Sequence, residues 1–112
     1  FDDVKDNFTI MREEPFGPLV PILTFKTFDD VIKRANDNDL GLCSYLYTNS
    51  MEKAQIGSEK LETGCVAVNT GVVAIAEAPF GGIKQTGYGR EGGSGAIKDY
   101  LNVKYTHMGL KI

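Results

Sequence analysis

The chain has 112 residues, a formal net charge of −3 and 42% hydrophobic residues, which fits one globular domain or part of one. The acidic balance and the lack of a basic stripe argue against a nucleic-acid partner, and no apolar run approaches the roughly 18 residues of a membrane span. A chain of this length is expected to bury roughly 65% of the surface that it exposes when unfolded.

The first half of the sequence predicts a strand followed by a helix. Residues 19–25 are mostly apolar and indicate a short strand, with Pro21 marking an irregular start or an edge. Thr27 and Asp30 fit a capping box. The helix that follows would bury the apolar positions spaced three and four apart, namely Phe28, Val31, Ile32 and Ala35.

The middle of the sequence predicts a strand, a helix and a second strand. Residues 42–48 indicate a strand with Tyr45 and Tyr47 on one face. A helix is expected from a start at Asn49 and Glu52 to Leu61, with Gly64 as its C′ glycine. Residues 65–69 form a continuous apolar strand, as in a sheet covered on both faces. This alternation predicts an α/β fold with βαβ units and a largely parallel sheet.

The last third is rich in glycine, with seven glycines among residues 81–95. Such a concentration is incompatible with a regular element and predicts a folded loop or a flexible tail. Residues 95–101 are expected to form a short helix. Apolar and polar residues alternate weakly over residues 103–108, which suits a terminal strand. This strand either pairs with the edge of another sheet or stays frayed.

A proline-rich hook near the start, Glu13–Pro18, offers a carboxylate and an aromatic ring. The residues before the two prolines are restricted to extended backbone, so the segment is stiff. An ionised Glu14 only accepts hydrogen bonds, which suits a pair of hydroxyls such as a ribose diol. Phe16 could lay its face on a flat heterocycle. A plain surface turn is the alternative interpretation.

A second motif lies at residues 78–84 and continues as a glycine-rich stretch at 86–92. Residues 87–92 match GxGxxG formally, but a dinucleotide-binding fingerprint needs a preceding strand and a following helix, so we interpret the match as accidental. The hook and the second motif, in this order and at this spacing, resemble the C-terminal quarter of an aldehyde dehydrogenase, and most closely the succinate-semialdehyde dehydrogenase branch. The resemblance implies an α/β catalytic-domain portion at residues 1–98 and an oligomerisation segment at 99–112.

The resemblance also implies roles for five residues. Glu14 would bind the nicotinamide ribose of NAD or NADP, and Phe16 would pack beside the nicotinamide. Phe80 would line the inner substrate tunnel, or would anchor a turn as a core residue. Residues 72–75 would form the mouth of the pocket, and this chain has Ala74 and Ile75 in the loop where succinate-semialdehyde enzymes usually carry a serine for the distal carboxylate. A hydrogen bond to a charged group contributes about 1.5–3 kcal/mol, so the substrate is expected to be a short semialdehyde or a smaller, less charged aldehyde.

The catalytic nucleophile is expected elsewhere. In the family it is a thiolate in a Gly-Gln-x-Cys context, which surrounds neither Cys43 nor Cys65. Both are expected to be buried, reduced and inert, and neither they nor His107 suggest a metal site. Because the chain begins with Phe1, we expect a fragment, inactive alone, of a longer cytoplasmic enzyme that forms dimers or tetramers and acts on a small aldehyde. The alternative is a non-catalytic module that only self-associates.

Overall fold

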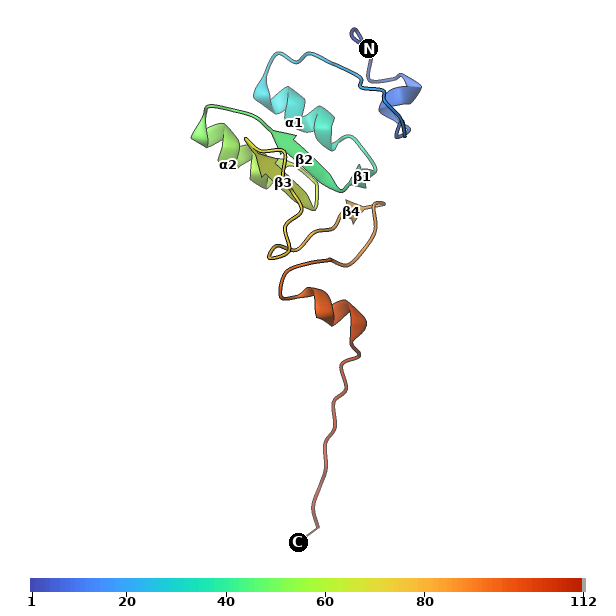
Figure 1. Cartoon of the computed structure of the whole chain (residues 1–112), viewed down its shortest axis with the longest axis vertical. Helices are drawn as coiled ribbons and strands as arrows, with labels where there is room; N and C mark the ends of the chain where they lie inside the picture. Colours follow the sequence, from blue (N-terminus) through green and yellow to red (C-terminus); the bar gives the residue numbers. More distant parts are fainter. Residues whose placement is uncertain (112) are drawn as a thin grey trace.

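Two parallel strands joined by a helix form the centre of the molecule. In the computed structural model, which describes residues 1–111, β2 (Cys43–Leu46) and β3 (Cys65–Val68) are parallel neighbours connected by α2 (Met51–Lys60). Helix α2 packs on these strands, and α1 (Phe28–Asn36) lies beside α2 (Figure 1). This β–α–β unit confirms the predicted arrangement of strand, helix and parallel strand.

A second strand pair stands next to this unit. β1 (Leu40–Gly41) pairs with β4 (Ile83–Lys84) in antiparallel orientation, which brings the glycine-rich loop back to the start of β2. The prediction of a largely parallel sheet is therefore correct only for β2 and β3. Two short 3-10 helices, η1 (Thr9–Met11) and η2 (Ala96–Tyr100), complete the regular structure of the described residues.

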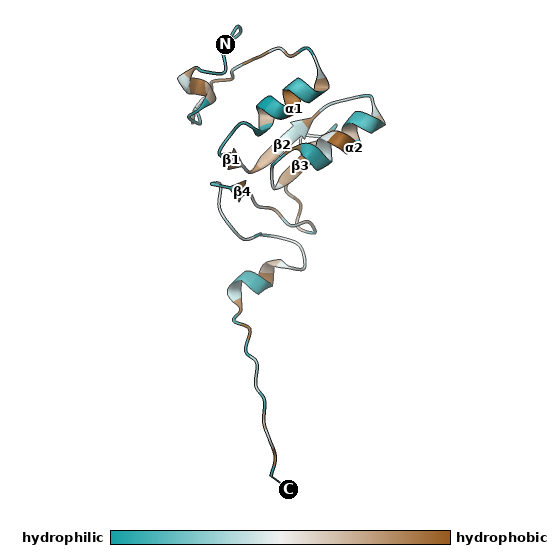
Figure 2. Ribbon diagram, turned by 180° about the vertical axis from the view of Figure 1, so that it is seen from behind, coloured by the Kyte–Doolittle hydropathy of each residue, from teal (hydrophilic) through white to brown (hydrophobic). Residues whose placement is uncertain are grey.

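The core is small and lies between the helices and the β2–β3 layer. Ile32 and Ala67 are its buried apolar side chains, and Figure 2 shows apolar colouring on β2 and β3 beside largely polar helix surfaces. Gly57 lets α2 pack closely on β2, because a Cβ at Gly57 would lie 2.5 Å from Cδ2 of Leu46 in β2. The predicted buried face of α1 is confirmed in part, since Phe28 and Val31 are half-buried but Ala35 is exposed.

Capping residues explain where the helices begin. The backbone N–H of Asp30 donates to Thr27 Oγ1 at 3.2 Å, which confirms the predicted start of α1. The start of α2 was predicted at Asn49, one residue too early. The capping residue is Ser50, whose Oγ accepts the N–H of Lys53 at 3.2 Å. Both residue types are good caps, and the backbone at Ser50 has the required extended conformation.

The end of α2 was predicted within one residue, since the helix ends at Lys60 and Leu61 caps it, but the role given to Gly64 was wrong. The cap residue Leu61 is extended, so no left-handed glycine follows the helix, and Gly64 is not a C′ residue. Instead, the Asn36 amide donates to the carbonyl of Lys60 at 2.8 Å, and this side chain satisfies one of the last carbonyls of the helix. Gly64 has a different role, in which its lack of a side chain admits the backbone of Gly81.

Residues 19–25 do not form the predicted strand. They share two backbone hydrogen bonds with Phe1, from Ile22 N to Phe1 O at 2.8 Å and from Phe1 N to Val20 O at 3.0 Å. Thr24 O also accepts from Arg34 Nη1 of α1 at 2.9 Å. A strand needs a ladder of partners along its length, and two bonds to one residue do not supply it. Apolar side chains of this segment remain exposed, including Leu19, Val20, Ile22 and Phe25.

The C-terminal segment extends away from the rest of the molecule (Figure 1). The helix predicted at 95–101 is present in 3-10 form as η2. Residues 101–111 are extended and exposed and form no strand with any other described residue, so the molecule measures 78 × 33 × 24 Å. The predicted boundary between residues 98 and 99 falls within η2 and stays a prediction, and residue 112 lies outside the described residues.

The chain exposes more surface than a globular monomer of its mass. Its accessible surface is 9577 Å², whereas a folded monomer of 12.2 kDa exposes about 6,000 Å² and its unfolded chain about 17,700 Å². The burial of roughly 65% expected from the length is therefore not reached. In the described part of the chain, no helix combines the length and the apolar character needed to cross a membrane.

Candidate functional site

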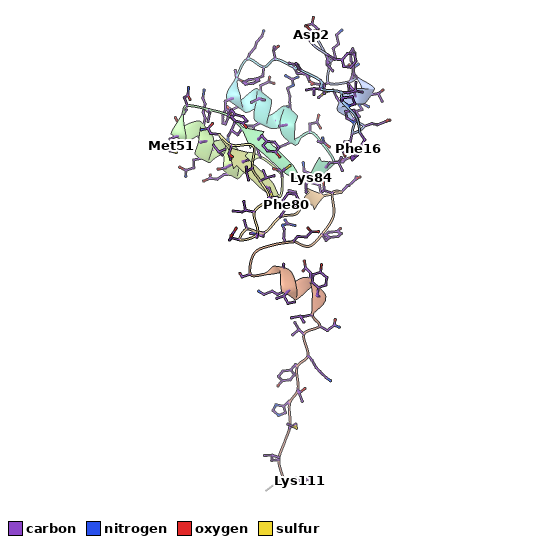
Figure 3. The ribbon with its side chains drawn as sticks, in the orientation of Figure 1. Asp2, Phe16, Met51, Phe80, Lys84 and Lys111 are labelled. Atoms are coloured by element: carbon purple, nitrogen blue, oxygen red, sulfur yellow. The ribbon has the colours of Figure 1, made fainter. Side chains whose placement is uncertain are left out.

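The proline-rich hook lies at the edge of the molecule after η1. Two tight turns shape it, with Gly17 N donating to Pro15 O at 2.9 Å and Leu19 N donating to Gly17 O at 2.8 Å. Glu14 is exposed, and Phe16 is 98% exposed. Figure 3 shows Phe16 at the outer edge of the N-terminal segment and Phe80 near the middle of the molecule.

Glu14 lines an open cavity of about 690 Å³ between the hook and the β2 region. The hook contributes Glu13, Glu14 and Pro15 to its wall. The opposite wall comes from the chain around β2 and from the glycine-rich loop, and it includes Leu42, Cys43, Ser44, Gln85 and Thr86. Phe16 is not part of this wall. A carboxylate is therefore presented at an open site, while the aromatic ring two residues later points elsewhere.

Phe80 lines a second, smaller cavity of about 340 Å³. The residue is half-buried, and its backbone is fixed by a two-way bridge to Glu91, with N–O distances of 2.7 and 2.8 Å. Residues of the glycine-rich loop, Leu42, and Asp99 and Tyr100 of η2 form the rest of the wall. The aromatic ring thus faces a cavity, and the Glu91 bridge also makes Phe80 an anchor of the loop.

The cavities of Glu14 and Phe80 are separate but share two wall residues, Leu42 and Thr86. Thr86 Oγ1 accepts the N–H of Gly41 at 2.7 Å, which fixes the glycine-rich loop against β1. Sequence analysis gave no role to either wall residue. The described residues do not bring Glu14 and Phe80 into one cavity, so their membership of a single active site stays a prediction.

Ala74 and Ile75 lie in an exposed loop between β3 and Phe80. Ile75 is 53% exposed, and neither residue lines the two cavities described above. The loop is anchored by Gly93 N, which donates to Ala76 O at 2.9 Å. Their predicted place at the mouth of a substrate pocket is therefore not tested by the geometry of this chain.

The two cysteines are neighbours in the parallel ladder, because Cys43 pairs in register with Cys65. Both thiols are free and half-buried rather than fully buried as expected. Cys43 Sγ lies 3.9 Å from Tyr45 Oη, and this contact raises the pKa of the tyrosine. Cys65 Sγ lies 3.9 Å from the carbonyl oxygen of Gly81. The predicted absence of a catalytic role for either cysteine remains a prediction.

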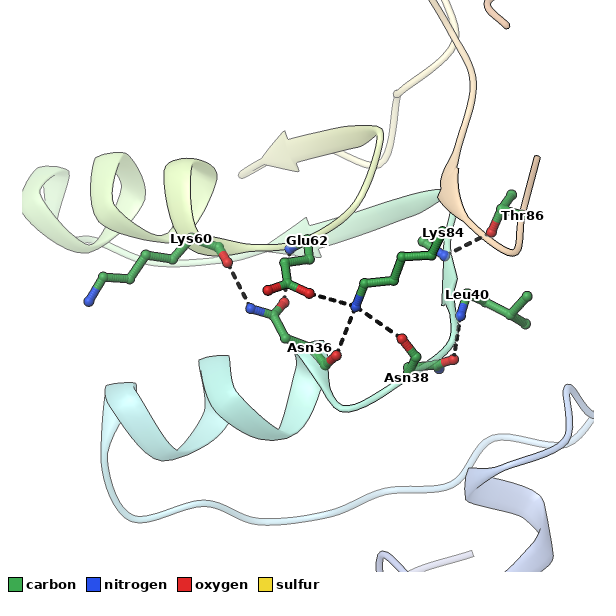
Figure 4. A network of polar contacts seen from close by, with 8 residues as sticks. Asn36, Asn38, Leu40, Lys60, Glu62, Lys84 and Thr86 are labelled. Carbon is green, nitrogen blue, oxygen red and sulfur yellow. Dashed lines mark hydrogen bonds and ion pairs between the residues drawn. The ribbon is translucent and has the colours of Figure 1, made fainter. Parts of the chain in front are cut away.

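Lys84 forms a polar network that sequence analysis missed (Figure 4). Its ammonium group lies 2.7 Å from Glu62 Oε2 and donates to the carbonyls of Asn36 at 2.8 Å and Asn38 at 3.0 Å. The sequence signal was a single lysine within the glycine-rich region. Its partners lie more than twenty positions away, and no local pattern indicates them.

Comparison with known proteins places the chain among well-defined relatives. The sequence model of the aldehyde dehydrogenase family matches residues 1–106. Mitochondrial succinate-semialdehyde dehydrogenase of Arabidopsis thaliana is 46% identical over 96% of the chain and 20% of that protein. A 3-sulfolactaldehyde dehydrogenase of Pseudomonas putida is 44% identical over 96% of the chain and 22% of that protein.

A solved structure shows the same similarity at the level of the fold. The crystal structure of an NADP-dependent enzyme of E. coli superposes with a TM-score of 0.91 and 46% identity, over 97% of this chain and 23% of that one. The chain thus spans about a fifth of the length of the proteins that it matches.

Proposed function

This chain belongs to the aldehyde dehydrogenase family, and we propose that it is the C-terminal portion of an enzyme that oxidises a short aldehyde to a carboxylate. In this proposal NAD or NADP accepts the hydride, and the thiolate nucleophile comes from a part of the enzyme outside this chain. The observation that carries the proposal is the 46% identity to a succinate-semialdehyde dehydrogenase over 96% of the chain. We call this longer protein the full-length enzyme.

The exposed hook fits part of a nicotinamide nucleotide. Glu14 presents a carboxylate at the wall of an open cavity, and a carboxylate can accept hydrogen bonds from both hydroxyls of a ribose. Phe16 is 98% exposed, so both ring faces are free to pack on a flat ring system. When bound, the cofactor supplies the acceptor for the hydride that leaves the aldehyde carbon. Glu14 and Phe16 would orient it.

We infer that the substrate is a short aldehyde with an anionic far end, as in succinate semialdehyde. The two relatives named above act, by their names, on a carboxylate-bearing and a sulfonate-bearing aldehyde, and their identities to this chain are nearly equal. Ala74 and Ile75 offer no side-chain donor to such a group. We therefore expect the anion to be bound chiefly by side chains outside this loop, with Phe80 lining the apolar part of the pocket.

A panel of aldehydes tests the enzymatic proposal. We expect the full-length enzyme to reduce NAD or NADP with succinate semialdehyde, and to give a kcat/KM about tenfold or more below that value with an uncharged aldehyde of the same length. The measurement is initial-rate formation of reduced cofactor with each aldehyde. A protein that turns over none of the panel would contradict the proposal and, if it still self-associates, would support the non-catalytic module instead.

We further propose that the C-terminal segment joins two subunits. Residues 103–108 are extended, and their backbone forms no ladder within the described chain, so they can add to the edge of a sheet in a second copy. We expect sedimentation analysis to give a dimer or tetramer for the full-length enzyme. Tyr105→Pro should shift the full-length enzyme toward monomer, because the proline nitrogen has no hydrogen to donate to the backbone ladder between subunits. An unchanged oligomer would count against this role.

A further inference from the structure

The backbone of Lys84 has an unusual conformation. Its φ is 56°, in the left-handed region that residues other than glycine rarely adopt. Such a conformation persists only when the surrounding structure holds it in place. At Lys84 the backbone is held by the pairing of β4 with β1, and the side chain adds three further contacts.

The side chain of Lys84 uses all its donors on three separate segments. An ammonium group has three N–H donors, and here they meet the end of α1 at Asn36, the α1–β1 connection at Asn38 and the segment after α2 at Glu62. The side chain is only 24% exposed, so water competes weakly for these contacts. Lys84 thus ties the glycine-rich loop to the centre of the fold (Figure 4).

Two of the three residues that accept from Lys84, Asn36 and Glu62, are also bonded to each other. The Asn36 side chain donates to Lys60 O at 2.8 Å and accepts from the N–H of Glu62 at 2.8 Å. Asn38 Oδ1 accepts from Leu40 N at 2.8 Å, at the start of β1. Two of the three acceptors are therefore backbone carbonyls held by the fold, and the third is the half-exposed carboxylate of Glu62.

This anchor lies four residues after Phe80. Gly81 and Gly82 separate Phe80 from β4, and they carry no side chains that could hold the loop. On the far side of β4, Gln85 N donates to Asp39 O at 2.9 Å, and Thr86 binds Gly41 N. Lys84 thus fixes one end of the segment from Phe80 to Lys84, in addition to the Phe80–Glu91 bridge and to Arg90 Nη1, which donates to Gly82 O at 2.8 Å. Phe80 and Leu42 both line the smaller cavity.

We propose that Lys84 is a positioning residue that sets the place of Phe80, and thereby the shape of the aldehyde pocket, without touching the substrate. This inference rests on the function proposed above. Removal of the ammonium group would leave two carbonyls and a carboxylate without their donor and would loosen the segment from Phe80 to Lys84, whereas Gln85 and Thr86 would keep their own bonds to Asp39 and Gly41. The aldehyde pocket would lose its fixed wall while the hook around Glu14 stayed in place.

The kinetic test compares Lys84→Met with Lys53→Met in the full-length enzyme. Lys53 is an exposed residue on α2 and provides a matched loss of one ammonium group. We expect Lys84→Met to raise the KM for the aldehyde about tenfold, with kcat and the KM for the cofactor each changed less than about threefold. Lys53→Met should leave all three constants unchanged. An unchanged aldehyde KM in an active Lys84→Met enzyme would overturn the proposal.

Hydrogen exchange gives a readout that does not depend on activity. Amides of residues 80–84 should exchange about tenfold faster in Lys84→Met than in the wild type, while those of β3 stay unchanged. Glu62→Gln, which removes only the charge of one partner, should show the same pattern more weakly and serves if Lys84→Met does not fold. Equal exchange in both variants and wild type would overturn the anchor. Wild-type enzyme that oxidises no aldehyde would overturn the proposed function instead, and the exchange result would still decide on the anchor.

Discussion

Replacement of Gly64 by alanine is expected to lower the free energy of unfolding of the full-length enzyme by about 3 kcal/mol or more, at the upper end of the cost of overpacking. A Cβ on Gly64 would overlap the carbonyl oxygen of Gly81 and would lie 2.8 Å from its carbonyl carbon and 3.0 Å from Gly82 Cα. All three are backbone atoms, so no rotamer change relieves the clash. Gly64 N also donates to Gly41 O at 3.0 Å, which keeps Gly64 from moving away.

Gly95→Ala is the matched control for this prediction. Its Cβ would meet nothing within 4 Å, and the backbone φ of −88° is allowed for alanine, so we expect a change within about 0.5 kcal/mol. Urea unfolding followed by circular dichroism measures both variants. Equal midpoints for Gly64→Ala and Gly95→Ala would contradict the close approach of the two backbones. Relief of the clash by movement of Gly81 would also displace Phe80, its neighbour in the sequence.

Local signals in the sequence predicted local structure well. The start of α1 at Thr27 and the strand at β3 depend on residues within one helical turn or one strand, and both predictions are confirmed. The start of α2 was missed by one residue because Asn49 and Ser50 are adjacent and equally suited to cap a helix. The choice between them is made by the backbone conformation, which the sequence pattern does not encode.

Predictions that needed a distant partner were less successful. The apolar pattern of residues 19–25 is typical of a strand, but a strand is stabilised by a ladder of backbone groups from another segment. Within the described residues this segment shares two backbone bonds with Phe1 and accepts one side-chain bond from Arg34. Gly64 was interpreted as a helix terminator because it follows α2. A glycine is needed there because the backbone of Gly81, seventeen positions later, occupies the space of a side chain. Neither partner can be identified from spacing alone.

The same division applies to the candidate site. Of the five residues given site roles from the sequence, Glu14 and Phe80 line the two cavities, whereas Phe16, Ala74 and Ile75 do not, and the roles of all five stay predictions. The wall between those cavities, formed by Leu42 and Thr86, had no local signal, because it results from the antiparallel pairing of β1 and β4. Lys84 was missed for the same reason, since its left-handed backbone and its partners arise only when four segments meet.

Replacement of Glu14 by glutamine tests the proposed role of the hook in cofactor binding. The change keeps the size of the side chain but removes its charge, and a hydrogen bond to a charged group contributes about 1.5–3 kcal/mol. We therefore expect kcat/KM for NAD or NADP to fall about 10- to 100-fold in the full-length enzyme. Stability should change within about 0.5 kcal/mol, because Glu14 is exposed.

Glu13 provides a close control for Glu14. It is the preceding residue, is also exposed and lines the same cavity, so Glu13→Gln removes an equal charge from an adjacent place. If a general attraction between the acidic hook and its surroundings governed activity, both variants would behave alike. If the Glu14 carboxylate binds the ribose, only Glu14→Gln should slow cofactor reduction in single-turnover experiments. Equal rates for both variants and the wild type would refute the ribose contact, because a lost charge-assisted hydrogen bond at that position must appear in the rate or in the affinity for the cofactor.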